Sequence, residues 1–548
     1  MCGICVIISE QKINRQEAKA CLDALEPRGP DVATEDVLVH GGLEVFVGFS
    51  RLHIQGSKAG AEQPFHLKSG GRVVCNGEVF NSDILIEQLG LEIPEGASDC
   101  AVIPALLDRG MPLAEVARQL DGDFAIVVVY EDRVEVARDP YGVRPLFYGT
   151  GAGLGSSQGP NGWRAFVSEL KGFPAGLDAV EAIEPGSVRI IPYDVTEEQT
   201  VISWHEVPWL KVPVWRSSLE GLTQGGEALR QSLEEAVAKR MSTVRAIGAC
   251  LSGGLDSSLV AALAAKILAK RGQRLHTYSI GMEGSPDLAH ARLVATHIGS
   301  IHHERVVTAA ECLAVIPAVV KAIETFDITT VRASVGNYLV AKLVATETPD
   351  VKVVLNGDGA DEALGGYLYM RAAPDDAAFE FETDRLLREI HMYDVCRSER
   401  TMAAHGLESR SPFLDRQFIA VARALPTDVL RPTESTIEKT ILRTAFSASG
   451  LLPRIVLWRR KEAFSDGISR AENSWFEMAR AEGERRASMS SATYEVNPPK
   501  TGEARWYREL FHEHYPLVAA AAVAPAMWMP RFVTATDPSA RTLNLYRG

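Results

Sequence analysis

The alternation of hydrophobic and polar residues divides the chain into two parts. In residues 1–205, β-branched and aromatic runs such as GICVIIS (3–9) and FAIVVVYEDRVEVARD (124–139) are separated by glycine, and few helical patterns intervene. Such runs are typical of β-strands. Many strands with few helices between them predict packed antiparallel sheets in this part of the chain.

The pattern changes after about residue 222. An apolar stripe at helical spacing in 229–241 is followed by short apolar runs, AIGACL (246–251), LHTYSI (275–280) and VKVVL (351–355), that alternate with helical segments. This alternation predicts βαβ units and a parallel sheet with helices on its faces. The proline-containing stretch 206–218 is the predicted linker.

We therefore expect two domains, residues 1–208 and residues 209–548. The first is an α+β domain with two stacked antiparallel sheets, and the second is an α/β domain with a parallel sheet. The length of 548 residues leaves ample material for two cores.

Composition narrows the possible environments and partners. The net charge of −14 argues against a nucleic-acid-binding surface, which needs a basic face. Eight cysteines are scattered singly, which favours a reducing compartment over a disulfide scaffold. The start of the chain lacks the features of a signal peptide, and no apolar run reaches the roughly 18 residues of a membrane span. We expect a cytoplasmic protein that binds neither membrane nor nucleic acid.

The loop SGGLDSS (252–258) lies between a predicted strand and a predicted helix. Its glycines let the backbone approach a ligand, and the free N–H groups at the start of the helix attract anions. It lacks the lysine of a Walker loop, so positive charge must come from elsewhere. The sequence predicts a phosphate cradle here; the alternative is an ordinary glycine turn with serine caps.

Two further segments belong to the same predicted site. The loop NGDGADE (356–362) follows another strand, and parallel strands place such loops at one edge of a sheet. Asp358, Asp361 and Glu362 are candidates for binding Mg²⁺ or for a general base, with a helix-capping turn as the alternative. Lys461 is the candidate for the missing positive charge, with a solvated basic turn as its alternative.

The cysteine at position 2 has a chemical use that depends on its place in the chain. If the initiator Met is removed, the α-amine of Cys2, with an unperturbed pKa of about 8, can serve as the base for its own thiol. The alternatives are an inert core cysteine or a C-x-x-C pair with Cys5. The pair is disfavoured because residues three apart on a strand point to opposite faces, so Cys5 is expected in the core.

Other residues of the first part suit recognition of free glutamine. Arg51 can bind a carboxylate, Asp99 an ammonium, and Asn76 with the N–H of Gly77 an oxyanion. Each has a structural alternative: a surface salt bridge for Arg51, a helix cap for Asp99 and a hairpin turn for the Asn-Gly pair.

Taken together, the motifs resemble those of glutamine-hydrolysing asparagine synthetases, a family that joins an N-terminal-nucleophile glutaminase to an ATP pyrophosphatase domain. They occur in family order: MCGI, RGPD, SRLHI, NGEVFN, SDC, RDPYGVRPLFYG, LSGGLDSSLVAA, SIGMEGSPDL, ETFDITTVRAS, GDGADE, HGLESRSPFLD, LWRRKEAFSDGIS and ATDPSARTL.

The resemblance implies a reaction and its residues. The implied small-molecule substrates are glutamine, aspartate and ATP. The resemblance also implies that ammonia crosses an internal tunnel to a β-aspartyl-AMP intermediate. The implied products are asparagine, AMP, pyrophosphate and glutamate. It implies catalytic roles for Cys2, Asn76, Gly77, Asp358 and Lys461. The implied glutamine-binding residues are Arg51, Leu52, His53, Ile54, Gln55, Asn76, Gly77, Glu78 and Asp99. The implied ATP-binding residues are Leu251, Ser252, Gly253, Gly254, Asp256, Ser257, Ile280, Asn356 and Gly357. Mg²⁺ is expected at Asp256 and Asp361, and the assembly is expected to be a homodimer, a state that the residues themselves do not give.

The chain departs from the family pattern at three positions. Asp358 stands where related enzymes have glutamate, which shortens the reach of the carboxylate by roughly one C–C bond, about 1.5 Å. Asn356 replaces a usual serine, and Glu62 is an extra residue.

Three rival functions remain. They are an amide-forming relative with another acceptor acid, a sensor or scaffold that binds glutamine and nucleotide, and a phosphoribosyl-transferring amidotransferase. The SGGLDSS loop disfavours the last of them.

Overall fold

The computed structural model describes most of the chain, and its parts group into two units. The described residues are 1–57, 61–152, 162–194, 196–205, 212–433, 436–461, 467–470, 474–489 and 492–543. Unit 1 consists of Met1–Glu206, Ala403–Leu407 and His512–Ala524, and unit 2 of Val207–Met402, Glu408–Phe511 and Pro525–Gly548. Residues 206–211 of the predicted linker lie outside the described residues.

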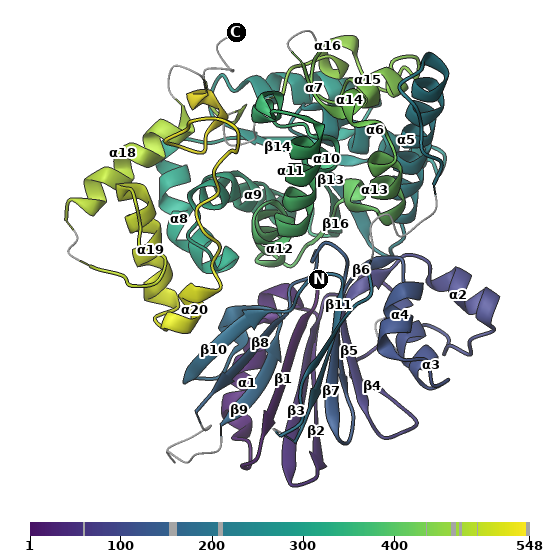
Figure 1. Cartoon of the computed structure of the whole chain (residues 1–548), viewed down its shortest axis with the longest axis vertical. Helices are drawn as coiled ribbons and strands as arrows, with labels where there is room; N and C mark the ends of the chain where they lie inside the picture. Colours follow the sequence, from purple (N-terminus) through teal and green to yellow (C-terminus); the bar gives the residue numbers. More distant parts are fainter. Residues whose placement is uncertain are drawn as a thin grey trace. The chain divides into compact units, whose positions relative to one another are not determined.

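Unit 1 contains two antiparallel sheets of six strands each (Figure 1). The first has the order β10 (Leu177–Ala182), β8 (Phe147–Gly151), β9 (Trp163–Val167), β1 (Gly3–Ser9), β3 (Leu43–Arg51), β2 (Val32–His40). The second has the order β12 (Thr200–Ser203), β11 (Ser187–Pro192), β7 (Arg133–Arg138), β6 (Gly122–Val129), β5 (Arg72–Val79), β4 (Phe65–His66). The helices are α1 (Arg15–Asp23), α2 (Ser82–Leu89), α3 (Val102–Leu107), α4 (Leu113–Gln119) and α20 (Val518–Ala522).

Strand β1 shows how the two-residue period builds the layers of unit 1. Ile4 and Val6 join a core that fills the space between the sheets, together with Val127 of β6. Cys5 and Ile7 point the other way, into a core under α1. A third core joins the outer face of the second sheet to α3 and α4. The order of layers is therefore α1, first sheet, second sheet, then α3 and α4.

The same alternation decides the question of the two N-terminal cysteines. Cys5 is fully buried in the core under α1, whereas Cys2 packs against the core between the sheets. The two thiols therefore lie on opposite sides of β1, as predicted, and cannot act as a C-x-x-C pair. All eight cysteines are free thiols.

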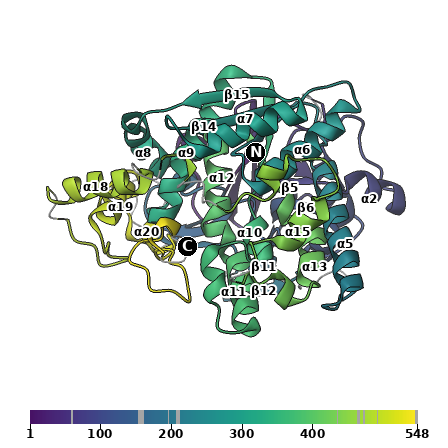
Figure 2. The same cartoon turned by 90° about the horizontal axis from the view of Figure 1, so that it is seen from above.

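Unit 2 is built on a five-stranded parallel sheet with helices against it (Figures 1 and 2). The strand order is β15 (Ile301–Val306), β14 (His276–Gly281), β13 (Ala246–Cys250), β16 (Val351–Leu355), β17 (Glu408–Arg410). The helices of its core are α5 (Leu219–Lys239), α6 (Leu255–Ala269), α7 (Pro286–Ile298), α8 (Ala309–Ile323) and α9 (Ile328–Glu347). The remaining helices are α10 (Ala360–Leu364), α11 (Asp376–Glu389), α12 (Asp394–Ala403), α13 (Arg416–Arg423), α14 (Thr427–Leu430), α15 (Thr440–Phe446), α16 (Arg454–Leu457), α18 (Trp475–Ala487) and α19 (Gly502–His514).

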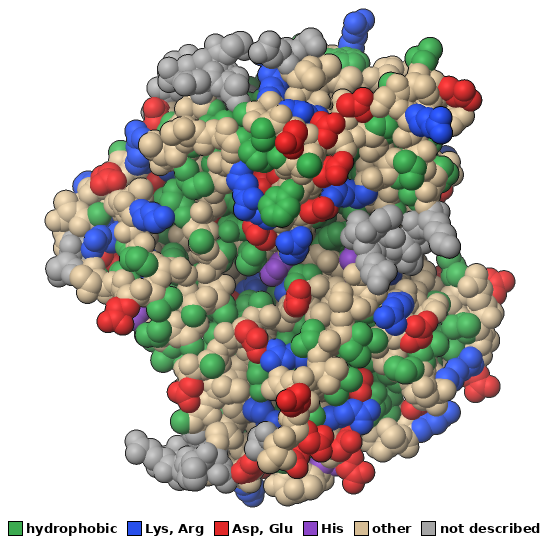
Figure 3. All heavy atoms as spheres, in the orientation of Figure 1, with side chains coloured by type: hydrophobic (Ala, Val, Ile, Leu, Met, Phe, Trp, Pro, Cys, Tyr) green, Lys and Arg blue, Asp and Glu red, His purple; other side chains and the backbone are tan. Residues whose placement is uncertain are grey.

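The predicted fold class is confirmed in both parts. Unit 1 has two stacked antiparallel sheets, and β13, β14 and β16 of unit 2 run parallel, with α6, α7 and α9 in contact with them. Within the described residues, no helix has the length and apolar character needed to cross a membrane. On the face seen in Figure 3, acidic and basic side chains are interspersed.

Candidate functional sites

The first candidate site lies in unit 1, where both sheets contribute residues around Cys2. Gly3 pairs with Ser50 in the antiparallel ladder of β1 and β3, so Cys2 lies next to Arg51 at the end of β3. From the second sheet, Asn76 of β5 reaches Cys2: the Cys2 nitrogen donates a hydrogen bond of 2.8 Å to Asn76 Oδ1. A central strand thus anchors the start of the chain.

Asn76 and Gly77 lie inside strand β5, so the hairpin-turn alternative for this pair is wrong. Asn76 is fully buried, and its Nδ2 has no hydrogen-bond partner among the described residues. A buried donor without a partner is costly, and at a reaction site it suits stabilisation of an oxyanion. Gly77 is required by packing, because a Cβ there would lie 2.4 Å from the backbone oxygen of Asp123.

The predicted glutamine-binding residues form a bonded group. Arg51 is 5% exposed, and its guanidinium donates to the carbonyl oxygens of Gln55 (2.9 Å) and Ser57 (3.0 Å), so it is not a surface salt bridge. Gln55 Nε2 donates to Glu78 Oε2 at 3.3 Å. Asp99 Oδ2 accepts from the Val79 nitrogen at 2.6 Å, beside Glu78.

The segment 52–54 between Arg51 and Gln55 alternates in burial. Leu52 and Ile54 are buried, whereas His53 is half-buried and its backbone nitrogen donates to Asp31 Oδ2 at 2.7 Å. Asp31 ends the RGPD motif, so the structure brings that motif to this site.

Arg28 is a residue of this site that sequence reasoning did not single out. It is 1% exposed, its Nε donates to the Cys2 carbonyl oxygen at 2.8 Å, and it forms a 2.5 Å ion pair with Glu169. Glu169 also pairs with Lys171 at 2.5 Å. The available signal was the RGPD motif, in which Arg28 is the first residue. The pair fixes the backbone on the carbonyl side of Cys2.

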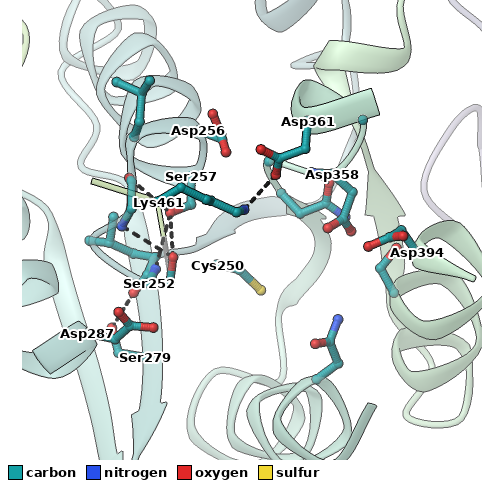
Figure 4. A pocket seen from close by; sticks show the side chains of 18 of the residues that line it. Cys250, Ser252, Asp256, Ser257, Ser279, Asp287, Asp358, Asp361, Asp394 and Lys461 are labelled. Atoms are coloured by element: carbon teal, nitrogen blue, oxygen red, sulfur yellow. Dashed lines mark hydrogen bonds and ion pairs between the residues drawn. The ribbon is translucent and has the colours of Figure 1, made fainter. Parts of the chain in front are cut away.

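The second candidate site is a pocket at the carboxyl ends of β13, β14 and β16 in unit 2. Both predicted loops line it, the first through Ser252, Gly254, Asp256 and Ser257 and the second through Asn356, Gly357, Asp358 and Asp361. Leu251 and Ile280 also line it. Cys250 and Lys461 line it as well (Figure 4). The prediction that the two loops face one crevice is confirmed.

The first loop has the geometry of an anion cradle. The hydroxyls of Ser252 and Ser257 lie 3.0 Å apart at the start of α6, whose N-cap is Gly254 with no side-chain cap bond, so serine capping does not explain the loop. Gly253 does not line the pocket; its φ of +73° makes the turn, and a Cβ there would lie 2.5 Å from the Ala291 nitrogen. The free N–H groups of a helix start and two hydroxyls favour phosphate.

The second loop packs directly against the first. A Cβ at Gly357 would lie 2.7 Å from the Ser257 nitrogen, so the two backbones touch there. Asn356 holds its loop from within: its Oδ1 accepts from Ser411 Oγ (2.8 Å) and from the Asp358 nitrogen (3.1 Å), and its Nδ2 donates to Ser409 Oγ (2.7 Å). Asn356 thus fixes the position of Asp358.

Ion pairs between lysine and aspartate side chains stabilise one part of the pocket. Lys461 Nζ lies 2.5 Å from Asp361 Oδ2, so this lysine supplies charge to the pocket and is not a solvated turn residue. Lys439, which sequence reasoning missed, lies 2.6 Å from both Asp256 Oδ2 and Asp361 Oδ1. Burial raises the pKa of Asp361, but the charges of Lys439 and Lys461 outweigh it and hold the pKa below its ordinary value. No sequence motif marks Lys439.

Asp358 belongs to a second charged group of the same pocket, which includes Arg397 and Asp394. Arg397 NH2 lies 3.0 Å from Asp358 Oδ1, and Arg397 NH1 lies 2.7 Å from Asp394 Oδ1. Burial, together with the charges of Asp394 and Asp361, raises the pKa of Glu362 to about 8. Neither Arg397 nor Asp394 was predicted, because both lie on α12, far in sequence from either loop.

The two predicted metal ligands fit Mg²⁺. Asp256 Oδ1 is buried and has no hydrogen-bond partner among the described residues, which suits a carboxylate that receives a cation. The described residues contain no group of three or more His, Cys, Asp or Glu side chains arranged to hold a metal. Mg²⁺ in nucleotide sites typically needs only one or two carboxylates besides the phosphates, so Asp256 and Asp361 are a sufficient protein set.

Comparison with known proteins covers the whole chain. A family model for asparagine synthase matches residues 228–386 and 373–531, and a model for a glutamine amidotransferase domain matches residues 1–210. The asparagine synthetases [glutamine-hydrolyzing] of Gallus gallus and Bos taurus are 38% and 39% identical over 100% of this chain and 99% of their own length. The probable asparagine synthetase [glutamine-hydrolyzing] of Acanthamoeba polyphaga mimivirus is 36% identical over 99% of this chain and 100% of its own.

The contact between the two loops gives a testable consequence. Gly357→Ala should weaken ATP binding by about fivefold or more, because the new Cβ would push the second loop away from Ser257 and overpacking of this kind costs about 1–3 kcal/mol. Gly226→Ala in α5 is the matched control, since a Cβ there meets no atom closer than 3.8 Å. Isothermal titration with ATP measures both. Equal affinity in the two variants would contradict the assigned contact.

Proposed function

The chain belongs to the family of glutamine-hydrolysing asparagine synthetases, and on this premise we propose that it makes L-asparagine from L-aspartate with nitrogen from L-glutamine and energy from ATP. The observation that carries the proposal is that each unit brings together side chains that suit one half of this reaction. We assign the glutaminase to residues 1–208 and the synthetase to residues 209–548.

In the glutaminase half, Cys2 Sγ attacks the side-chain amide carbon of glutamine, forms a thioester and releases ammonia; water then releases glutamate. The base is the α-amine of Cys2 once Met1 has been removed. Met1 is 1% exposed in the full chain, so its removal would also empty space beside this nitrogen. Asn76 Oδ1, 2.8 Å away, orients the amine.

The remaining residues of this site then have defined tasks. Asn76 Nδ2 and the Gly77 N–H hold the oxyanion that develops on the amide oxygen. Arg51 faces the α-carboxylate of glutamine and Asp99 its α-ammonium, in a group ordered by Gln55 and Glu78.

In the synthetase half, the side-chain carboxylate of aspartate attacks the α-phosphorus of ATP and pyrophosphate leaves. Ammonia then attacks the carbonyl carbon of the β-aspartyl-AMP, and AMP leaves with one carboxylate oxygen. The start of α6, the loop Ser252–Ser257 and Lys461 hold the phosphates. Asp256 and Asp361 would hold Mg²⁺, which supplies positive charge to the phosphates when bound.

Asp358 is the residue that favours a second candidate function. Arg397 holds its carboxylate, which is one methylene shorter than the glutamate of related enzymes. A shift of about 1 Å near reacting atoms can change rates strongly, so an acceptor acid other than aspartate is the alternative. A screen of carboxylic acids with ATP and ammonia separates the two candidate functions.

The ammonia passage, the homodimer and the cytoplasmic location stay predictions.

The proposal is tested by product analysis with aspartate, ATP and glutamine labelled with ¹⁵N in its amide. We expect ¹⁵N-asparagine, AMP, pyrophosphate and glutamate in equal amounts, measured by mass spectrometry and ³¹P NMR. Formation of ADP, or failure to form asparagine, would contradict the proposal.

Replacement of the nucleophile separates the two half-reactions. Cys2→Ala should abolish asparagine synthesis from glutamine and leave synthesis from added ammonia, because only the first half uses the thiol. Cys5→Ala is the control: its thiol lies in the core under α1, so both activities should persist. Steady-state rates with each nitrogen source decide this, and loss of both activities in Cys2→Ala would argue against two separate sites.

A further inference from the structure

Lys439 occupies a position that none of the roles above explains. It precedes α15 and is 3% exposed, and its single ammonium contacts a carboxylate from each of the two loops of the pocket. Asp256 comes from the first turn of α6 and Asp361 from α10. These are the same two carboxylates that we assign to the divalent cation.

We propose that Lys439 is the internal counter-cation of the pocket: its ammonium pairs with one carboxylate from each loop. One of these ion pairs must break before a divalent cation can bind between the two carboxylates. This positioning role rests on the proposed function only in that the pocket binds a metal–nucleotide complex. It predicts that the cation binds weakly alone and tightly with nucleotide.

The first argument is the occupancy of the carboxylate oxygens. Lys439 contacts Asp256 Oδ2 and Asp361 Oδ1 at 2.6 Å each, and Lys461 contacts Asp361 Oδ2 at 2.5 Å. Asp256 Oδ1 has no hydrogen-bond partner among the described residues, whereas each oxygen of Asp361 lies within 2.6 Å of a lysine nitrogen. A cation shared by both aspartates therefore has to take an Asp361 oxygen from a lysine, and the two positive charges repel each other at this range.

The second argument is that the backbone and its neighbours are shaped to hold this lysine. Lys439 has a left-handed φ of +57°, a conformation that non-glycine residues rarely keep unless the surroundings impose it. The preceding Glu438 accepts from Arg443 NH2 at 2.6 Å and from the Lys461 nitrogen at 2.8 Å. A Cβ at Gly366 would lie 2.2 Å from Lys439 Cε, so the lysine stem fills the space above a glycine.

The third argument concerns what nucleotide would change. The phosphates of ATP offer the ammonium groups of Lys439 and Lys461 new anionic partners, which would free oxygens of Asp256 and Asp361. Each ligand then favours the other, because each lowers the cost of separating the lysines from the aspartates. Such coupling is reciprocal by thermodynamic necessity.

The test measures Mn²⁺ binding to the full chain without nucleotide. The concentration of free Mn²⁺ is read from its electron paramagnetic resonance signal. Lys439→Met should bind one Mn²⁺ per chain at least about tenfold more tightly than the unmodified protein, because the competing charge is gone. Lys439→Arg keeps the charge and should resemble the unmodified protein. Adding Asp256→Asn to Lys439→Met should remove the gained site. Unchanged or weaker Mn²⁺ binding by Lys439→Met would overturn the proposal.

A second measurement guards against misfolding of the variant. In the unmodified protein, a non-hydrolysable ATP analogue should lower the Kd of the protein for Mn²⁺ by at least about tenfold, after the Mn²⁺ bound by free analogue has been subtracted. Equal affinity with and without the analogue would overturn the proposal on its own. Because neither assay contains glutamine or an acceptor acid, their failure is distinguishable from a failure to make asparagine.

Discussion

The ion-pair cluster formed by Asp256, Asp361, Lys439 and Lys461 is the constraint on which the nucleotide pocket depends. A parallel sheet brings the loops after β13 and β16 to one edge, and these loops place two carboxylates in a buried space. Two such charges would be costly without compensation, and two lysines from a later part of the chain provide it. In the proposed function the same lysines face the phosphates of ATP, so neutralisation of the carboxylates and recognition of the substrate use the same groups.

Unit 1 depends on a different constraint, the exact placement of a chain end. Chain ends are ordinarily poorly anchored, but here β1 is a central strand with both faces buried, and its ladder with β3 fixes Cys2 beside Arg51. The bond from the Cys2 nitrogen to Asn76 joins the first sheet to the second, and Arg28 holds the carbonyl side of the same residue.

The features that could be predicted from sequence are those with local causes. Two-residue alternation predicted the sheets of unit 1, and strand–loop–helix patterning predicted the parallel sheet and the loops that line the pocket. Cys2 could be singled out as a candidate nucleophile because that chemistry requires its position, and its role stays a proposal. The hairpin-turn alternative for the Asn76–Gly77 pair is wrong, since its local preference for a turn is overridden by pairing of β5 with β6. Lys439 and Arg397 lie in no motif, and the RGPD motif is the only local signal for Arg28. Their contacts with Asp256, Asp358 and Cys2 span 183, 39 and 26 positions, respectively. Such roles arise only from the tertiary structure.

The most direct test of the proposed adenylation of aspartate follows oxygen in the synthetase reaction. Aspartate labelled with ¹⁸O in its side-chain carboxylate is converted in the presence of ATP and ammonia, and the AMP is analysed by mass spectrometry. If the carboxylate is adenylated in this pocket, each AMP formed carries one ¹⁸O atom in its phosphate. AMP without the label would contradict the account, because the oxygen of the acid would then never have been bonded to phosphorus.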